Sequence, residues 1–245
     1  MPRLRALWRT IAFSWTALEA YVSFLALWVR KRGRVEAKRR AEWLHHWCAK
    51  VLPRLGINYQ CDGVPPASGM IICNHVSYLD IFVMSAIVPC AFVAKKEIES
   101  WPLFGGLSHM AGTLFLDRER RSDTQRVGGE LEERLASGTV VVLFPEGTSS
   151  DGTEVLQFRS SLFEPALNAG AQLTPAHVSY RAADAAVTTE IAYWGEMKML
   201  PHVMSLLGKP EIAATVRFGK SNSPLQDRKQ TAMAMREAVM RLGKQ

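Results

Sequence analysis

The stretch Ile72–Val88, "ICNHVSYLDIFVMSAIV", joins two apolar runs through a short polar segment. The first apolar run, Met70–Cys73, has the length of a buried strand. Ser77 with Asp80 three residues later, directly before the second apolar run, predicts a helix start, with Ser77 as the N-cap and Asp80 as its reciprocal partner. A strand followed at once by a helix is the repeating unit of an α/β fold, and His75 lies in the connection between them.

The same alternation continues along the chain after Pro65-Pro66. A helix is predicted over 122–136, and a closing helix is predicted from Pro224 with Ser223 as its N-cap. The short apolar runs that predict strands are Met70–Cys73, Cys90–Ala94, Thr113–Leu116, Thr139–Phe144, Gln172–Ser179, Val187–Tyr193 and Glu211–Phe218. We therefore expect an α/β fold with a mainly parallel or mixed sheet flanked by helices.

Positive charge is concentrated at the N-terminus. Residues 1–50 hold 11 Lys and Arg against 3 Asp and Glu, a net charge of +8, whereas the other 195 residues hold 19 against 20, a net charge of −1. This distribution argues against a core that binds nucleic acid and favours a basic attachment segment. The four cysteines have no CxxC spacing, so we expect free thiols in a reducing compartment and no metal site.

The N-terminal segment predicts two helices. Ile11–Val29 contains one charged residue and would form a helix about 28 Å long, close to the thickness of a bilayer core. Val35–Leu55 is basic and amphipathic, with Trp43 and Trp47 on one side. We expect residues 1–56 to form a two-helix arm that associates with an anionic membrane surface, either monotopic or anchored by its N-terminus. The alternative is a soluble helical hairpin that covers the core.

Polar motifs follow three of the predicted strands: "NHVSYLD" (74–80), "GTLFLDR" (112–118) and "FPEGTSS" (144–150). In this order they resemble the NH-x4-D, G-x-x-F-hydrophobic-D-R and FPEGT-S blocks of the glycerolipid acyltransferase family of the lysophosphatidate (1-acyl-sn-glycerol-3-phosphate) acyltransferase type. "VAKKEIESWPLFG" (93–105) is similar to the segment that this family places between its first two blocks. The resemblance covers about residues 57–180, and it continues more weakly over 193–202.

The resemblance implies that residues 57–245 form an acyltransferase domain at the cytoplasmic face of the cell inner membrane. Such an enzyme moves a fatty acyl chain from acyl-CoA or acyl carrier protein, as co-substrate, to the free hydroxyl of a lysolipid. Lysophosphatidate, which would give phosphatidate, is the leading acceptor, and no further cofactor is implied. The alternatives are a lyso-ornithine-lipid acyltransferase and a non-enzymatic membrane lipid-binding module. Thioester consumption would separate the module from the two enzymes.

His75 and Asp80 have the chemistry that acyl transfer to an alcohol requires. A neutral imidazole removes the alcohol proton near pH 7, and a carboxylate on its other nitrogen orients the ring and stabilises the imidazolium ion. On one continuous helix the two residues would lie roughly 140° apart. The pair therefore works only if His75 precedes the helix and Asp80 lies in its first turn. Because no G-x-S-x-G motif is present, we expect direct transfer without a serine acyl-enzyme.

Four further residues are candidates for substrate binding, because the resemblance associates the second and third blocks with the acceptor phosphate. Arg118 can grip a phosphate or carboxylate with two parallel hydrogen bonds. Gly147 allows close backbone approach, and Thr148 can donate a hydrogen bond. Glu146 is poorly placed beside an anion, so we expect it to bind a hydroxyl or to orient Arg118. The alternative for each block is an ordinary turn. Arg159 departs from the family, which often has Lys followed by Gly at this point.

Overall fold

Strand β2 (Met70–Cys73) lies in the middle of the sheet and is buried on both faces. Ile71 and Cys73 belong to the apolar cluster under α2 and α3, whereas Met70 and Ile72 belong to the cluster under α5 and α8. All four residues are completely buried. A strand with two buried faces needs helices on both sides, so this strand alone requires a three-layer arrangement. The structure is a computed structural model that describes residues 2–101, 104–117 and 121–244.

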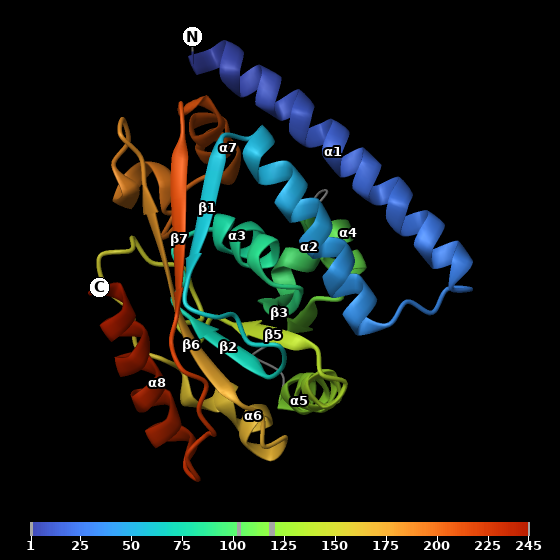
Figure 1. The fold of residues 1–245 in the computed structure, drawn as a ribbon, viewed down its shortest axis with the longest axis vertical. Helices are drawn as coiled ribbons and strands as arrows, with labels where there is room; N and C mark the ends of the chain where they lie inside the picture. Colours follow the sequence, from blue (N-terminus) through green and yellow to red (C-terminus); the bar gives the residue numbers. More distant parts are fainter. Residues whose placement is uncertain (1, 102–103, 118–120, 245) are drawn as a thin grey trace.

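Among these residues, seven strands form one mixed sheet in the order β1-β7-β6-β2-β5-β3-β4 (Figure 1). β6 and β7 are antiparallel, and every other neighbouring pair is parallel. The strands are β1 (Ile57–Asp62), β2, β3 (Cys90–Lys95), β4 (Leu114–Leu116), β5 (Val140–Leu143), β6 (Leu173–Arg181) and β7 (Ile212–Phe218). The predicted fold class, an α/β fold with a mixed sheet, is confirmed.

Helices cover both faces of the sheet (Figure 1). α2 and α3 pack on one face, and α5, α6 and α8 pack on the other. The α-helices are α1 (Pro2–Arg30), α2 (Ala37–Arg54), α3 (Leu79–Ile87), α4 (Phe104–Ala111), α5 (Arg121–Ala136), α6 (Glu164–Asn168), α7 (Met199–Gly208) and α8 (Arg228–Gly243). Shorter helical turns are η1 (Lys96–Ser100), η2 (Ser160–Phe163) and η3 (Val187–Ile191). The helix expected over 122–136 is α5, with Val127, Leu131 and Leu135 buried.

The apolar side of α2 faces the protein. Val51 and Leu52 are buried in the core, and Trp43 Nε1 donates hydrogen bonds to the carbonyl of Ala20 and the hydroxyl of Ser23, both on α1. Trp43 and Trp47 of α2 therefore face α1. They pack against α1 because a helix that lies between another helix and the sheet buries its apolar side.

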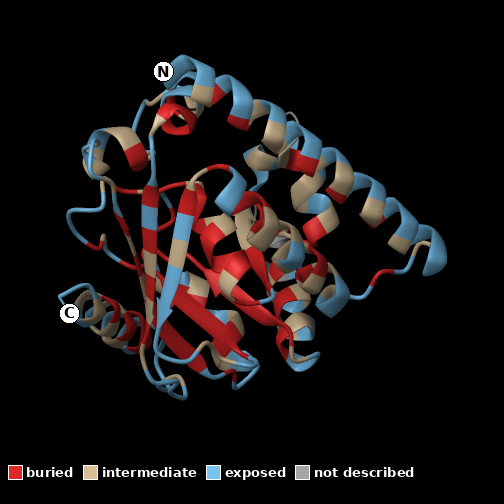
Figure 2. Cartoon of the chain, turned by 45° about the horizontal axis from the view of Figure 1, so that its top comes forward, coloured by how far each residue is buried: buried red, intermediate tan, exposed pale blue. Residues whose placement is uncertain are grey.

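The exposed apolar side chains of the arm lie on α1. This helix runs along the outside of α2 and reaches α7 (Figure 1), and much of it is exposed (Figure 2). By length and composition α1 could cross a membrane. Its one acidic residue, Glu19, turns inward to Lys50 of α2 at 2.8 Å. The exposed large apolar residues of α1 are Leu4, Leu7, Trp8, Ile11, Trp15, Leu18, Tyr21, Val22, Leu25, Trp28 and Val29.

Arg9, which the sequence places among the basic residues flanking the apolar segment, is buried. Its guanidinium donates to the carbonyls of Leu207, Lys209 and Pro210 at the C-terminal end of α7. These carbonyls have no partner within the helix, and a cation there also complements the helix dipole. Arg9 therefore fastens α1 to the core.

Two strand predictions differ from the structure. Val187–Tyr193 was expected as a strand, but Val187–Ile191 forms the π-helical turn η3. Its β-branched residues favour a strand, yet β6 already has β2 and β7 on its two edges, so no position beside it remains. β1 (Ile57–Asp62) has no counterpart among the predicted strands. It is an edge strand whose residues after Ile57 are mostly exposed, so it lacks an apolar pattern.

The closing helix begins later than expected. α8 starts at Arg228, and Asp227 is its N-cap, accepting hydrogen bonds from the amides of Lys229 and Gln230. Ser223, the expected cap, instead accepts a hydrogen bond from Gln172. Asp is as good an N-cap as Ser, so the cap chemistry at Asp227 is as favourable as the one expected at Ser223.

Candidate active site

The carboxyl ends of β2, β5 and β3 lie side by side because these strands are parallel neighbours. β2 leads into His75, β5 into residues 144–150, and β3 ends at Lys95. After β2 the chain forms β3, which lies beyond β5 towards the β4 edge of the sheet. After β5 the chain crosses in the opposite direction and forms β6, on the other side of β2. Crevices at such reversals of strand order are where α/β folds bind their ligands.

His75 and Asp80 are in contact. His75 lies in the loop before α3, and Asp80 lies in the first turn of that helix. His75 Nδ1 is 2.7 Å from Asp80 Oδ2. Because a carboxylate only accepts hydrogen bonds, Nδ1 carries the proton and Nε2 keeps a free lone pair. The contact and its position at the helix start agree with the geometry that the sequence requires of a base and its orienting carboxylate.

Ser77 does not cap α3 through its side chain. The helix begins at Leu79 without a side-chain cap, and among the described residues the buried Ser77 hydroxyl has no hydrogen-bond partner. Asp80 does reach back, because Oδ2 also accepts from the amides of Val76 at 2.7 Å and Ser77 at 3.0 Å. The expected N-cap is therefore wrong for Ser77, and Asp80 both braces the loop and holds the imidazole.

Glu146 fixes the backbone of His75. It is 4% exposed, its Oε1 accepts from the His75 amide at 2.9 Å, and its Oε2 accepts from the Leu156 amide at 3.2 Å. Burial raises the pKa of Glu146 to about 7, although the two amides act in the opposite direction. The Ser150 amide donates to the His75 carbonyl at 2.8 Å, so both polar groups of the His75 backbone are held. Both oxygens of Glu146 thus face the protein backbone.

Three residues that the sequence did not single out as a site hold this pair in place. The Phe144 ring stacks on the His75 imidazole with centroids 4.3 Å apart. The Asn74 side chain exchanges two hydrogen bonds with the backbone of Val178 on β6. Tyr180, two residues further along β6, donates to Asp80 Oδ1 at 2.6 Å. Asn74 and Phe144 lie inside the recognised motifs, whereas no local pattern marks Tyr180.

The remaining predicted residues are Gly147, Thr148 and Arg118. Gly147 and Thr148 line the same cavity as His75. Gly147 has φ +75°, which only glycine adopts readily, and its amide donates to the Phe144 carbonyl in the turn after β5. Arg118 lies outside the described residues, so its expected role in phosphate binding remains a prediction.

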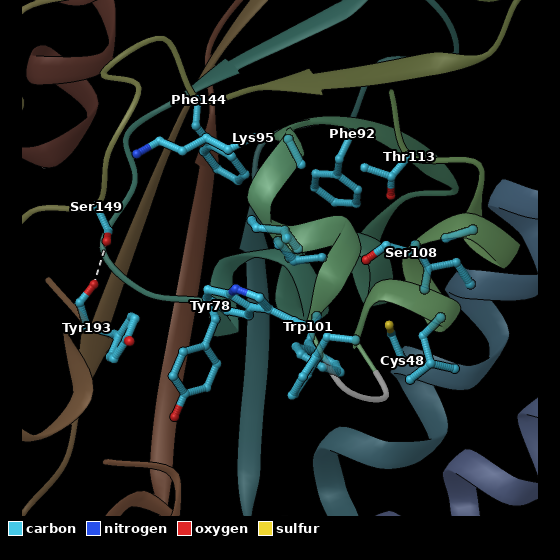
Figure 3. A pocket seen from close by; sticks show the side chains of 18 of the residues that line it. Cys48, Tyr78, Phe92, Lys95, Trp101, Ser108, Thr113, Phe144, Ser149 and Tyr193 are labelled. Carbon is cyan, nitrogen blue, oxygen red and sulfur yellow. Dashed lines mark hydrogen bonds between the residues drawn. The ribbon is translucent and has the colours of Figure 1, made fainter. Parts of the chain in front are cut away.

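The segment around Tyr193 forms another wall of the site. The Tyr193 amide donates to the Val76 carbonyl at 3.0 Å, and the Ser149 hydroxyl donates to the Tyr193 carbonyl (Figure 3). Tyr78 donates to His202 Nδ1, and His202 Nε2 donates to the Ala192 carbonyl, each at 3.0 Å. Burial lowers the pKa of His202, which is consistent with a neutral structural residue. The weakly similar region 193–202 is thereby attached to the His75 loop.

A cavity of about 580 Å³ extends from His75 and is lined by residues of α1, α2, α3 and α4. Figure 3 shows aromatic side chains around it, among them Tyr78, Phe92, Trp101 and Phe144. Side chains of opposite charge, Lys95 and Glu97, also contribute to its lining. The other lining residues include Phe13, Thr16, Ala17 and Ala20 of α1, Trp43, Leu44 and Trp47 of α2, and Ile81 and Phe82 of α3. The cavity is therefore mostly apolar.

The cysteines are free thiols, as predicted. Cys48 lines the cavity, and burial raises its pKa to about 12, so it is protonated at neutral pH and a poor nucleophile. In the part of the chain that the structure describes, no three His, Cys, Asp or Glu side chains are grouped as a metal site would require.

The sequence profile described as "Acyltransferase" matches residues 58–179. Curated relatives include a lyso-ornithine lipid O-acyltransferase of Rhizobium meliloti, 32% identical over 82% of this chain and 71% of that protein. A protein of the same name from Pseudomonas aeruginosa is 33% identical over 84% of this chain and 81% of its own length. A 1-acyl-sn-glycerol-3-phosphate acyltransferase of Neisseria gonorrhoeae is 41% identical, over 47% of this chain and 45% of that protein.

Among solved structures, the fold is similar to that of the 1-acyl-sn-glycerophosphate (LPA) acyltransferase PlsC from Thermotoga maritima. The TM-score is 0.69 at 19% sequence identity, and the match covers 100% of this chain and 99% of that one. The likeness therefore includes the N-terminal helices as well as the sheet.

Proposed function

The chain belongs to the lysophosphatidate acyltransferase family of lysophospholipid acyltransferases, and from this premise we propose that it transfers a fatty acyl chain from acyl-CoA or acyl carrier protein to the free hydroxyl of a lysolipid. The observation that carries the proposal is the hydrogen bond between His75 Nδ1 and Asp80 Oδ2, which leaves Nε2 unprotonated beside an apolar cavity.

In the proposed reaction, His75 Nε2 accepts the proton of the lysolipid hydroxyl as that oxygen attacks the thioester carbonyl carbon. The buried Asp80 carboxylate stabilises the imidazolium that forms. The tetrahedral intermediate then collapses, the C–S bond breaks, and the imidazolium returns its proton to the departing thiolate. His75 is thus neutral before and after each turnover, and no acyl-enzyme forms.

The cavity beside His75 suits a hydrocarbon chain. Its walls are mainly aromatic and aliphatic, and its volume of about 580 Å³ is within the usual range for ligand pockets. Burial of a chain there would hold the reacting carbonyl or hydroxyl near Nε2, which supplies the proximity that a reaction between two substrates needs.

Lyso-ornithine lipid is supported as acceptor by two observations. The relatives with that name align over most of their own length. Lys95 and Glu97 both line the cavity, and an ornithine headgroup offers a carboxylate to the first and an ammonium group to the second. A phosphate monoester would be attracted by Lys95 but repelled by Glu97, and it offers no cation to Glu97. We therefore place lyso-ornithine lipid first.

Lysophosphatidate, the first expectation from the sequence, is the second candidate. The Neisseria relative has the higher identity, over 47% of this chain. Arg118 would then hold the phosphate. For this acceptor we predict that Arg118→Ala raises the Michaelis constant at least about tenfold, or 1.4 kcal/mol, and that Arg118→Lys restores it only in part. An unchanged constant would remove Arg118 from headgroup binding.

We further propose that the enzyme works at the cytoplasmic face of the inner membrane, where its donors are soluble and its acceptor is a lipid. The exposed apolar side of α1 would rest in the bilayer surface. The basic residues of the α1–α2 turn, Arg30 to Arg34, would contact anionic headgroups.

One experiment tests the reaction and ranks the acceptors. The purified full chain is incubated with a long-chain acyl-CoA, or the acyl carrier protein thioester, and vesicles with equal amounts of the two lysolipids. We expect thioester consumption, a preference for lyso-ornithine lipid and no turnover by His75→Ala. Preference for lysophosphatidate would reverse the order of acceptors. No thioester consumption by the wild type would leave the non-enzymatic lipid-binding module.

A further inference from the structure

The Asp80 carboxylate is buried and receives four hydrogen bonds. Three of them, from His75 Nδ1 and the amides of Val76 and Ser77, end on Oδ2. Among the described residues, the one donor to Oδ1 is the Tyr180 hydroxyl, at 2.6 Å. Asp80 is 1% exposed, so water does not replace a missing donor. Tyr180 therefore supplies the contact that holds Oδ1, while the other three donors hold Oδ2.

Tyr180 comes from a different part of the chain than the rest of the pair. It lies on β6, which pairs with β2 directly before the His75 loop. Its hydroxyl is a donor at every physiological pH, because burial and the Asp80 charge raise its pKa well above the usual value. Asn74 holds the same strand two residues earlier, through the backbone of Val178. β6 thus fixes both ends of the segment that carries His75 and Asp80.

We propose that Tyr180 is a positioning residue for the acyl transfer. Its hydroxyl holds the Asp80 carboxylate so that Oδ2 meets His75 Nδ1, and this contact sets the proton affinity of the His75–Asp80 pair. The inference rests on the function proposed above, since it concerns the same base. Tyr180 is buried and is not among the described residues that line the cavity, so it would act through Asp80.

The sign of its effect follows from which protonation state the hydroxyl stabilises. A hydrogen bond to the Asp80 carboxylate is strongest when the carboxylate is charged and His75 is neutral. Removal of the Tyr180 hydroxyl raises the energy of this state more than the energy of the state with one additional proton, whichever of the two residues holds that proton. The pair then binds its proton more tightly. The base is consequently lost at a higher pH.

Other ionisable groups surround the pair on each side. They are Glu146 after β5, Cys73 on β2, Tyr78 at the start of α3 and His177 on β6. All are present in the wild type and in Tyr180→Phe, so the difference between the two proteins isolates the Tyr180 hydroxyl.

The test compares full-length wild type with Tyr180→Phe and with Tyr59→Phe, a tyrosine on β1 away from the site. kcat and KM are measured from pH 5 to 9 with acyl-CoA and vesicles holding both lysolipids. We expect Tyr180→Phe to lower kcat about tenfold, to change either KM less than about twofold, and to raise the midpoint of the acidic limb by about half to one pH unit. Tyr59→Phe should match the wild type.

The proton affinity is also measured without turnover, by NMR titration of the His75 imidazole, assigned with His75→Ala. The wild type could be inactive while Tyr180→Phe still raises the titration midpoint of His75. This result would contradict the proposed function and would support the role of Tyr180 at Asp80. An active wild type with unchanged midpoints in Tyr180→Phe would overturn the role of Tyr180. If Tyr180→Phe changed only the thermal stability, the role of Tyr180 would likewise be overturned.

A second variant covers the case in which Tyr180→Phe does not fold. Site-specific incorporation of difluorotyrosine at Tyr180 keeps the ring and gives a more acidic phenol, which is a stronger donor. The midpoint should then move to lower pH. An unmoved midpoint would again overturn the proposal.

Discussion

At the scale of single residues, Asp80 combines two roles that substitutions can separate. Asp80→Asn removes the charge that stabilises the imidazolium and leaves amide hydrogens facing backbone donors, so both turnover and stability should fall. We predict a loss in kcat of about 10² to 10⁴. His75→Ala should lose at least about 10³ while the fold and vesicle binding remain.

Ser77→Ala is the matched control for Asp80→Asn, because the Ser77 hydroxyl caps nothing in α3. It should leave kcat and the unfolding midpoint close to wild type. Turnover and thermal unfolding of the three variants check these statements together. His75→Ala with a tenth of wild-type activity would remove His75 from the mechanism, and Asp80→Asn with altered stability only would leave Asp80 a purely structural role.

Glu146 gives a prediction about pH. Its pKa is about 7 in the folded protein, above the ordinary 4.5, so between these values the folded state binds a proton that the unfolded state has released. Stability from this group therefore falls as pH rises from about 4.5 to 7. Glu146→Gln has no such titration. The stability of wild type relative to Glu146→Gln should drop by about 2 to 3 kcal/mol between pH 5 and 8.

Urea unfolding at pH 5, 6, 7 and 8 measures this difference. A difference that stays constant over this range would mean that Glu146 is already ionised at pH 5. A difference that grows with pH would reverse the sign and contradict the raised pKa.

Whether a contact between two residues can be predicted from the sequence depends on how far apart they lie along the chain. His75 and Asp80 are five residues apart, and the helix start between them restricts their geometry enough to be predicted. Tyr180 is separated from Asp80 by 100 residues and reaches it only because β6 pairs with β2. The use of Glu146 as a brace for the His75 amide has the same origin, since it depends on β5 lying beside β2.

At the scale of elements, the start of α8 separates the expected cap from the observed one. Asp227→Ala should destabilise the protein by about 1 kcal/mol, because two amides of the first turn lose their acceptor. Ser223→Ala removes one exposed side-chain contact and should change stability by less than about 0.5 kcal/mol. Urea unfolding of both variants decides between them. A larger effect from Ser223→Ala would restore the sequence-based cap.

Strands were predictable where burial on both faces imposes an apolar sequence. β2 and β5 are entirely buried, and their predicted runs match the observed strands within a residue or two. β1 is an exposed edge strand held by hydrogen bonds to β7, and these leave no hydrophobic pattern. Val187–Tyr193 has the pattern without the strand, because both edges of β6, the strand that precedes it, are already paired with β2 and β7. The apolar content of a segment therefore predicts whether it is buried more reliably than it predicts whether it pairs with another strand.

At the scale of the whole molecule, the arm divides its two helices between different tasks. α2 packs into the core, whereas α1 presents its apolar side to the surroundings. We predict that Leu18→Glu combined with Val22→Glu weakens vesicle association at least about tenfold, since both residues are more than half exposed on one face of α1.

Met233→Glu is the control, because Met233 is an apolar residue on α8 that is also more than half exposed. Flotation with anionic vesicles measures binding, and added salt should weaken the wild type if the basic α1–α2 turn contributes. Unchanged flotation of the Leu18/Val22 variant would place the membrane contact elsewhere. Substitutions serve better than deletion of α1, because Arg9 also completes the end of α7.

One helix separates the catalytic cavity from the surroundings on the side of the arm: Phe13, Thr16, Ala17 and Ala20 of α1 line the cavity, and the opposite side of α1 is exposed. With α1 resting in a bilayer, a lysolipid would travel in the plane of the leaflet to reach His75. The enzyme would then respond to a surface density. Diluting the lysolipid with inert phospholipid, at constant total lysolipid, should slow turnover as if substrate had been removed.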